Sequence, residues 1–212
     1  MSLFNFKKKR NNYEPEEMGM FEKVSFAQFK EDFEKVVGTD VKEDILQKIY
    51  DDIQLPKRST SGSAGYDFMV PFDVELYRGS NIIVPTGIKA YIDSDAFLAL
   101  YPRSGMGFKY RVMLANTVGI IDSDYWMSDN EGHIMVKLTY DGMKNCYINS
   151  GVYDENKVVI RSYVNNDVVY QDSPLVLNQG DKFVQGIFIP YGKTEDDEAT
   201  TKRNGGMGST GK

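Results

Sequence analysis

Short strand-like segments bounded by turn residues occupy most of the chain from Leu55 onward. They read NIIVPTGIKAYI, AFLALY, HIMVKLTY, KVVIRSYV and DKFVQGIFI, and clusters of Gly, Pro, Asn and Asp separate them. β-Branched and aromatic residues in partial alternation favour strands, and closely spaced turns are typical of β-sandwiches and barrels. The sequence therefore predicts a mainly β, jelly-roll-like domain.

A helical pattern precedes these strands. Ser25 and Gln28 have the spacing of a capping box, and Asp40 and Glu43 repeat it. Two apolar stripes at helical spacing follow the two caps: Phe26, Phe29, Phe33, Val36 and Val37, then Val41, Ile45, Leu46, Ile49 and Tyr50. We expect a helical hairpin over about 25–53 whose stripes face the core.

Composition and charge exclude several classes of protein. The net charge of −6 argues against broad electrostatic attraction to nucleic acid. Cys146 is the only cysteine, so an internal disulfide is impossible and a thiolate zinc site is excluded. No apolar run approaches the length of a membrane span. We expect a soluble, cytoplasmic protein.

The domain organisation follows from these patterns. Residues 1–19 are expected to be a disordered tail, and 20–53 a short strand plus the helical hairpin. Residues 54–191 form the β domain, with an inserted hairpin at about 148–175. Residues 192–212 form a Gly-rich C-terminal arm, expected to be flexible without ligand.

Five stretches combine glycine with polar residues at strand edges. They are SAGYDF (63–68), PRSGMGFK (102–109), NTVGIIDSDY (116–125), QGDKFVQG (179–186) and RNGGMGSTGK (203–212). Glycine lets the backbone approach a ligand, and an arginine fork suits phosphate oxygens. Carboxylates at Asp67, Asp122, Asp124 and Asp181 suit a hydrated Mg²⁺. Together they predict a metal–nucleotide site, although Asp181 is expected to close a turn and Asp124 to be structural.

The last stretch ends in GGMGSTGK, which has the glycine and lysine spacing of a P-loop without a helix behind it. A Gly-rich segment can bind an anion through its backbone N–H groups alone. His133 is the only histidine, and no nucleophile elbow accompanies it. We expect His133 to have a surface or structural role.

In this order the five stretches resemble the five motifs of the homotrimeric dUTP pyrophosphatases. The resemblance covers about residues 54–212; LPKRSTSGSAGYDF and the pair PRSG and ANTVGIIDSDY are its most specific parts. The variant DSDYWMSDNEGHI resembles enzymes of Gram-positive bacteria and their phages, which implies the cytoplasm of a bacterial host. It implies a dUTPase (β-clip) barrel, a homotrimer with active sites shared between subunits, and Mg²⁺-dependent cleavage of dUTP to dUMP and pyrophosphate. That reaction would keep uracil out of DNA and supply dUMP for thymidylate synthesis.

The resemblance also implies roles for individual residues. Asp122 would activate the attacking water, and Asp67 would hold a triphosphate-bound Mg²⁺ through water. The phosphate ligands would be Arg103, Ser104, Gly105, Gln185, Arg203, Gly208, Ser209 and Thr210. The base and sugar contacts would be Asn116, Gly119, Ile120, Ile121, Met135 and Tyr125, with Tyr125 under the deoxyribose.

Two other functions compete with this interpretation. A dCTP deaminase shares the fold, but its chemistry needs a carboxylate near the pyrimidine C4, and the 116–125 motif contains no Glu. A nucleotide-gated regulator is the second, because phage dUTPases can bind repressor proteins. The inserted hairpin would then carry the partner surface.

One position departs from the family pattern and yields a prediction. Met207 stands where the family usually has a Phe that stacks on uracil. A thioether can lie against a ring but loses ring-on-ring overlap. We expect Met207→Phe to lower KM for dUTP in steady-state assays of pyrophosphate release, with little change in kcat. An unchanged or raised KM would contradict this.

Overall fold

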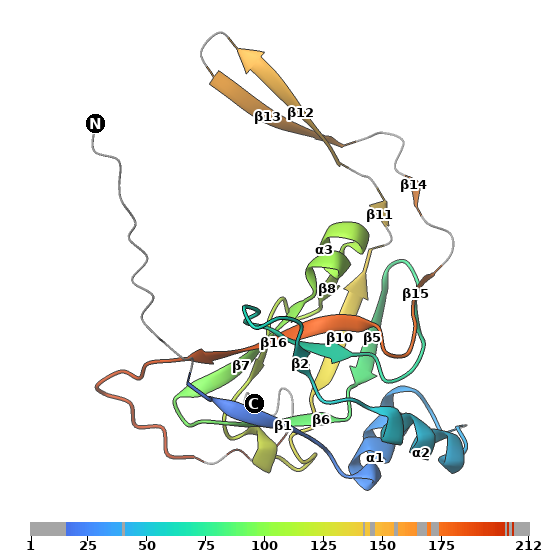
Figure 1. The fold of residues 1–212 in the computed structure, drawn as a ribbon, viewed down its shortest axis with the longest axis vertical. Coiled ribbons are helices and arrows are strands. Elements are labelled where there is room, and N and C mark those ends of the chain that lie inside the picture. Colours follow the sequence, from blue (N-terminus) through green and yellow to red (C-terminus); the bar gives the residue numbers. More distant parts are fainter. Residues whose placement is uncertain are drawn as a thin grey trace.

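Antiparallel strands make up most of the computed structural model (Figure 1), which describes residues 16–39, 41–141, 143–144, 147–154, 157–164, 169–170, 174–201, 203 and 205. The largest sheet has five strands in the order β2 (Lys57–Arg58), β3 (Tyr66–Met69), β16 (Lys182–Pro190), β7 (Ala96–Pro102) and β9 (Gly119–Ile121). The central strand β16 comes from the far end of the chain and pairs with β3 and β7. Three of the five stretches singled out by sequence thus meet in one sheet.

The remaining strands form smaller sheets. β5 (Ser80–Pro85), β10 (Met135–Tyr140) and β8 (Val112–Leu114) form a three-stranded sheet. β1 (Gly19–Lys23) pairs with β6 (Ile88–Ile92), and β4 (Val74–Leu76) pairs with β15 (Leu175–Leu177). The mainly β prediction is confirmed. The jelly-roll topology is finer than these pairings test and stays a prediction.

The predicted inserted hairpin falls on two paired strands. β12 (Tyr147–Asp154) runs antiparallel to β13 (Lys157–Val164), and β11 (Met143–Lys144) pairs with β14 (Val169–Tyr170). Among the described residues β11, β12, β13 and β14 pair only with one another, and none of them joins the five-stranded sheet.

The predicted helical hairpin is present as α1 (Phe26–Val36) and α2 (Glu43–Asp52), which lie together at one end of the strands (Figure 1). The Ser25 side chain caps α1 by accepting a hydrogen bond from Gln28 N at 3.1 Å. The predicted start of the second helix is wrong. α2 begins at Glu43, its N-cap residue is Lys42, and no side chain caps it. Asp40 lies outside the described residues.

The two apolar stripes are only partly buried. Phe29, Phe33 and Leu46 enter the core, whereas Val36, Val37 and Ile45 are exposed. Burial of each of the three core side chains contributes about 1.5–3 kcal/mol. Each helix therefore uses one narrow face to dock on the β domain.

α3 (Ser104–Tyr110) and a 3₁₀ turn, η1 (Tyr125–Met127), complete the described helices. The turn belongs to the loop 122–134, which contains positive φ angles at Glu131 (56°) and Gly132 (73°). A Cβ at Gly132 would lie 2.5 Å from Trp126 Cα and 2.9 Å from Tyr125 O. The loop is thus closed so tightly that only glycine fits there.

This close approach predicts the cost of a side chain at the loop. Gly132→Ala should lower the free energy of unfolding by about 2 kcal/mol or more, because a backbone clash adds to the unfavourable φ. Gly79→Ala is the matched control: its φ is 74° and no atom lies within 4 Å of an added Cβ. It should cost about 1 kcal/mol. Equal losses in urea titrations of the two variants would contradict the packing argument.

Candidate functional site

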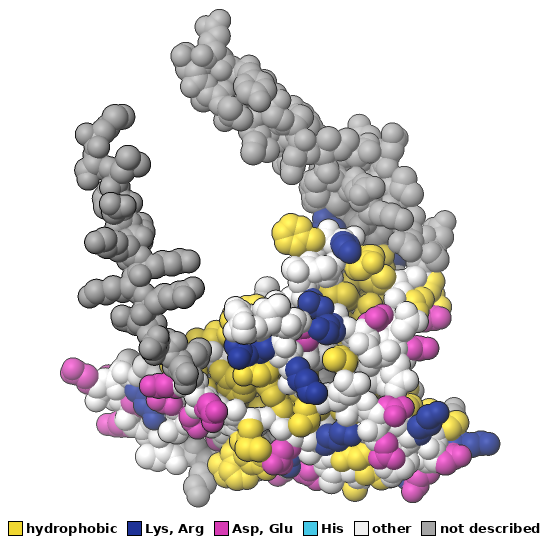
Figure 2. Space-filling view, in the orientation of Figure 1, with side chains coloured by type: hydrophobic (Ala, Val, Ile, Leu, Met, Phe, Trp, Pro, Cys, Tyr) yellow, Lys and Arg dark blue, Asp and Glu magenta, His cyan; other side chains and the backbone are white. Residues whose placement is uncertain are grey.

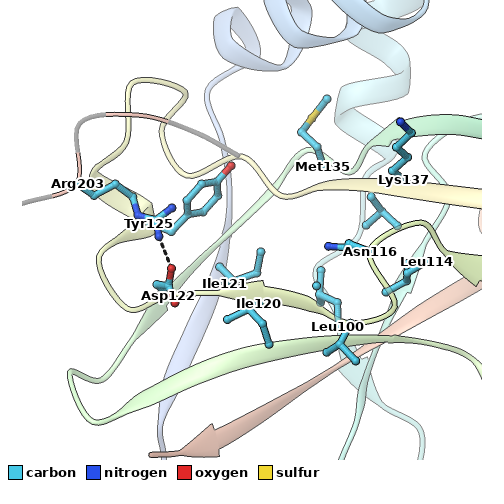
Figure 3. A pocket seen from close by; sticks show the side chains of 13 residues that line it. Leu100, Leu114, Asn116, Ile120, Ile121, Asp122, Tyr125, Met135, Lys137 and Arg203 are labelled. Carbon is cyan, nitrogen blue, oxygen red and sulfur yellow. Dashed lines mark hydrogen bonds and ion pairs between the residues drawn. The ribbon is translucent and has the colours of Figure 1, made fainter. Parts of the chain in front are cut away.

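A pocket of about 350 Å³ lies between β9, β10 and the loop that follows β9 (Figure 3). Eight residues predicted from the sequence line it: Asn116, Gly119, Ile120, Ile121, Asp122, Tyr125, Met135 and Arg203. The remaining lining residues were not predicted: Leu100, Leu114, Val118, Val136 and Lys137. Figure 3 shows Asp122 and Tyr125 at one end of the pocket and Asn116 and Leu114 at the other.

β9 presents an open backbone edge to this pocket. In the described part of the chain β9 pairs only with β7, with Gly119 opposite Leu100 and Ile121 opposite Leu98. An edge strand carries unpaired N–H and C=O groups on its free side. A planar ligand with its own donors and acceptors can pair with such an edge, and the Asn116 amide adds one more donor and acceptor.

Tyr125 is fixed as one wall of the pocket. The residue is 3% exposed, and its Oη donates to His133 O at 3.1 Å and accepts from Asn130 Nδ2 at 3.2 Å. Burial raises the pKa of the Tyr125 phenol. The hydroxyl therefore stays protonated and donates to His133 O, which holds the ring in one orientation.

Asp122 and Asp124 lie beside this wall and hold an arginine from the C-terminal arm. Arg203 Nη2 pairs with Asp122 Oδ2, and Arg203 Nε lies 3.1 Å from Asp124 Oδ1. The guanidinium also sits 5.4 Å from the centre of the Tyr125 ring. The Asp122 side chain remains 48% exposed, so solvent can reach it. Asp124 shares Arg203 with Asp122, and its expected structural role stays a prediction.

A second cluster of predicted residues gathers around Asp67 on β3. Its Oδ2 accepts from Ser59 Oγ at 2.6 Å and Lys182 Nζ at 2.9 Å, and its Oδ1 lies 3.1 Å from Arg103 Nε. Burial would raise the pKa of Asp67, but hydrogen bonds from Ser59 and Lys182 and the charges of Arg103 and Lys182 lower it below its ordinary value. The carboxylate is thus held ionised and orients two cations.

The other predicted phosphate ligands are next to this cluster. Ser104 and Gly105 begin α3 directly after Arg103, and a Cβ at Gly105 would meet nothing within 4 Å. Gln185 on β16 lies opposite Asp67 and Tyr101. Figure 2 shows Lys and Arg side chains over the region where Figure 1 places β2 and β16. This face can attract an anionic group.

Within one chain the two clusters are well separated. Strands β7 and β9 are antiparallel and Ile121 lies opposite Leu98, so Asp122 lies beside Phe97 of β7. Arg103 comes six residues after Phe97, just beyond the other end of β7. Six residues of extended strand span about 20 Å. Asp122 and the Arg103 cluster of one chain therefore cannot hold the same phosphate group.

Four predicted binding residues cannot be located in this structure, and two residues of the Asp67 cluster were not predicted from the sequence. Met207, Gly208, Ser209 and Thr210 lie outside the described residues. Lys182 and Ser59 were not predicted individually, although they lie within the segments QGDKFVQG and LPKRSTSGSAGYDF. Asp181 closes a turn as expected, because its Oδ2 accepts from Asn178 N at 2.8 Å.

His133 is structural, so the surface alternative is wrong. The side chain is completely buried, and Nδ1 lies 2.8 Å from Asp32 Oδ2. In the described part of the chain no group of three or more His, Cys, Asp or Glu residues could hold a metal ion. Among the same residues, no helix combines the length and apolar character that crossing a membrane requires.

Comparisons with known proteins agree with the resemblance seen in the motifs. The family model described as dUTPase matches residues 51–153. The deoxyuridine 5'-triphosphate nucleotidohydrolase of Lactococcus lactis subsp. lactis (strain IL1403) is 35% identical over 162 residues, which are 75% of this chain and 89% of that protein. The protein of the same name from Escherichia coli O45:K1 (strain S88 / ExPEC) is 31% identical, over 74% of this chain and 87% of its own. The crystal structure of dUTPase from Streptococcus mutans covers 82% of this chain and 98% of its own at 28% identity, with a TM-score of 0.52.

The Asp67 cluster predicts a pH-dependent contribution to stability. Because the pKa of Asp67 is lowered in the folded chain, its contribution is present above the unfolded value of about 4 and is lost as pH falls through the folded pKa. Asp67→Asn should therefore lower the free energy of unfolding by about 1–2 kcal/mol at pH 7, and the difference from wild type should shrink below about pH 4. Denaturation series from pH 7 to pH 3 measure this.

Asp95→Asn is the control for these series, because the Asp95 side chain is exposed. It should follow wild type at every pH. If the free energies of unfolding of wild type and Asp67→Asn differ by the same amount from pH 7 down to pH 3, the charge of Asp67 does not stabilise the fold.

Proposed function

The chain belongs to the dUTPase family and hydrolyses dUTP to dUMP and pyrophosphate, and from this premise we propose that Asp122 orients and deprotonates the water that attacks the α-phosphorus. The observation that carries the proposal is the pocket itself, in which an open strand edge, an amide, an aromatic wall and a solvent-accessible carboxylate follow one another. A general base must reach the attacking water by a hydrogen bond, which the half-exposed Asp122 can do.

Uracil binds along β9 in this proposal. The free edge of Gly119–Ile121 and the Asn116 amide pair with the uracil edge in the manner of a base pair. Cytosine would present a donor where the site also offers one, and buried polar groups without partners discriminate strongly. Thymine is excluded by close backbone approach at its 5-methyl group. Met135 covers the base from β10, next to Lys137.

Tyr125 lies under the deoxyribose. Its ring is immobile because the hydroxyl is bound to His133 O and Asn130 Nδ2. A fixed ring leaves no room for a 2′-hydroxyl, so the sugar preference follows from the position of the ring. The reaction would keep uracil out of DNA and supply dUMP for thymidylate synthesis.

The triphosphate is held by the Arg103 cluster. Lys182 and Gln185 on β16 and Arg103, which follows the adjacent strand β7, supply donors, and Ser104 and Gly105 add backbone N–H groups. From the arm, Arg203, Gly208, Ser209 and Thr210 complete the binding. In this structure Arg203 pairs with Asp122 and Asp124, so it must exchange these partners for phosphate oxygens.

The Asp67 cluster suits a magnesium ion that arrives with the triphosphate. Both Asp67 oxygens already accept hydrogen bonds or face a cation, which fits a contact through water rather than direct coordination. Bound Mg²⁺ would supply neutralisation of negative charge on the phosphate oxygens.

The separation of the two clusters requires a shared site. Because Asp122 and Arg103 of one chain lie about 20 Å apart along β7, a nucleotide bound at Asp122 must receive its phosphate ligands from another copy. A homotrimer, in which each boundary builds one site, satisfies this requirement.

The rival functions have less support. In the described part of the chain no Glu lines the pocket, so the carboxylate that a dCTP deaminase needs near the pyrimidine ring is missing there. The paired strands β12 and β13 would offer a regulator an added surface. Pull-down of a repressor-type partner with and without residues 150–173, combined with dUTPase assays, separates that function from catalysis.

Neutralising the proposed base tests the mechanism directly. Asp122→Asn should lower kcat for pyrophosphate release from dUTP by about 10²–10⁴-fold, the usual contribution of general base catalysis. Asp129→Asn is the control, because Asp129 lies in the same loop with an exposed side chain, and it should keep wild-type activity. A fully active Asp122→Asn enzyme would exclude Asp122 as the base.

Mixing two inactive variants tests the shared site. Asp122→Asn and Arg103→Ala chains, dissociated and reassembled in equal amounts, should recover roughly one quarter of wild-type activity. Each site takes Asp122 from one chain and Arg103 from another. In an equal mixture, half of the sites receive a chain with an unchanged Asp122, and in half of these the other chain has an unchanged Arg103. A mixture of Asp122→Asn chains with chains that carry both substitutions should have no activity, because no chain in it has an unchanged Asp122. Activity no higher than that of the separate variants would show that each site lies within one chain.

A further inference from the structure

Three buried polar side chains lie outside the proposed catalytic machinery. Gln28 and Asp32 of α1 and His133 of the loop 122–134 are 8%, 6% and 0% exposed. Gln28 Nε2 donates to Asp32 Oδ2 at 2.9 Å, and the same oxygen lies 2.8 Å from His133 Nδ1. Burying a carboxylate is costly unless it is hydrogen-bonded, so this arrangement needs an explanation beyond packing.

Both ring nitrogens of His133 are engaged. Gly87 N donates to Nε2 at 2.8 Å, so Nε2 is the unprotonated nitrogen and the proton sits on Nδ1, which donates to Asp32. The ring is neutral and cannot rotate without losing one of the two bonds. α1 and the turn at Gly87 thereby hold His133 from two sides.

The main chain of His133 connects this arrangement to the pocket. Its carbonyl accepts from Tyr125 Oη at 3.1 Å and from Asn130 Nδ2 at 3.3 Å. A shift of His133 therefore moves the acceptor that orients the Tyr125 ring. No other hydrogen bond from the Tyr125 hydroxyl as donor is present among the described residues.

A second contact fastens the same loop to the start of α1. Glu131 accepts from Ser25 N at 2.9 Å and from Ser25 Oγ at 2.6 Å. Burial would raise the pKa of Glu131, but the bonds from Ser25 and the charge of Lys89 lower it. Glu131 thus takes the part that Gln28 has in the predicted capping box, and α1 contacts the loop at two points two turns apart.

We propose that Asp32 and His133 are positioning residues for the sugar-binding end of the pocket, so that α1 sets how strictly the enzyme rejects a 2′-hydroxyl. The inference rests on the proposed role of Tyr125 under the deoxyribose. α1 acts through a chain of direct contacts: Asp32 holds the His133 ring, the His133 carbonyl holds the Tyr125 hydroxyl, and the Tyr125 ring forms the wall.

The test compares dUTP with UTP. Asp32→Ala removes the acceptor for His133 Nδ1 at a position where Ala favours the helix. We expect the ratio of kcat/KM for dUTP to that for UTP to fall by about tenfold, mainly through a higher KM for dUTP, because a small misplacement of a positioning group is costly. Glu31→Ala is the matched control, since Glu31 neighbours Asp32 and also pairs with Lys35 but does not reach His133. It should leave the ratio unchanged.

A readout independent of activity comes from Trp126, the single tryptophan, which follows Tyr125 in η1 and packs on Tyr91 with ring centres 5.0 Å apart. Its emission should change in Asp32→Ala and not in Glu31→Ala. Asp32→Asn keeps an oxygen that can accept from Nδ1 and should restore both the ratio and the emission to near wild type. If Asp32→Ala does not fold, His133→Asn replaces it in the test. The Asn amide can still donate to Asp32, but the acceptor for Gly87 N is lost. We expect the same fall in the preference for dUTP over UTP.

The outcomes separate this inference from the proposed function. A wild-type enzyme that prefers dUTP, together with an unchanged ratio and unchanged Trp126 emission in the folded variants, overturns the inference alone. A wild-type enzyme that hydrolyses dUTP and UTP equally well overturns the proposed role of Tyr125. Altered emission in Asp32→Ala would still establish the link from α1 to the loop in that case.

Discussion

The hydrogen bond from Tyr125 Oη to His133 O is the interaction on which the pocket depends. A buried phenol without a partner costs about 1–3 kcal/mol, and the loop 122–134 is folded so that this partner is its own main chain. The conformation that forms this hydrogen bond has unfavourable features. The φ angles of Glu131 and Gly132 are positive, and the buried Asn130 Oδ1 has no hydrogen-bond partner in the described structure. Such strain is typical of loops whose shape is needed for function, and here it is balanced by the contacts with α1.

Two aspartates of the site have opposite surroundings, and the difference matches their proposed roles. Asp67 is buried and accepts from Ser59 and Lys182 while facing Arg103, so it is a fixed anion, as its proposed part in arranging phosphate donors requires. Asp122 is half exposed, and Arg203 is the one side chain that pairs with it among the contacts described for it. A group that orients cations gains from being locked, whereas a group that must take a proton from water has to remain accessible. The fold meets these two requirements at separate places, because Asp67 lies on β3 and Asp122 follows β9.

Much of this could be predicted from the sequence, because the features concerned are local. Strand alternation, turn residues and the Ser25 cap report on nearby backbone, and the motif 116–125 carries Asn116, Asp122 and Tyr125 in one continuous segment. The contacts that were missed are long-range: Glu131 completes the cap of a helix 106 residues away, Asp32 reaches His133 across 101 residues, and Lys182 reaches Asp67 across 115. No periodicity in the sequence encodes such pairings.

The C-terminal arm adds a last constraint, which joins the two halves of the site. Its root is fixed, since Tyr191 N and Oη donate to the main chain at Asp95 and Ser94. Twelve residues then lead to Arg203, enough for about 40 Å of extended chain. The position of Arg203 is therefore decided by charge rather than by reach, and in this structure Asp122 and Asp124 hold it. A triphosphate carries more negative charge than these two carboxylates and competes for the same guanidinium. If Asp122 is the base, as proposed, binding of the triphosphate would release Asp122 from Arg203, and this one cation would couple the position of the arm to the availability of the carboxylate.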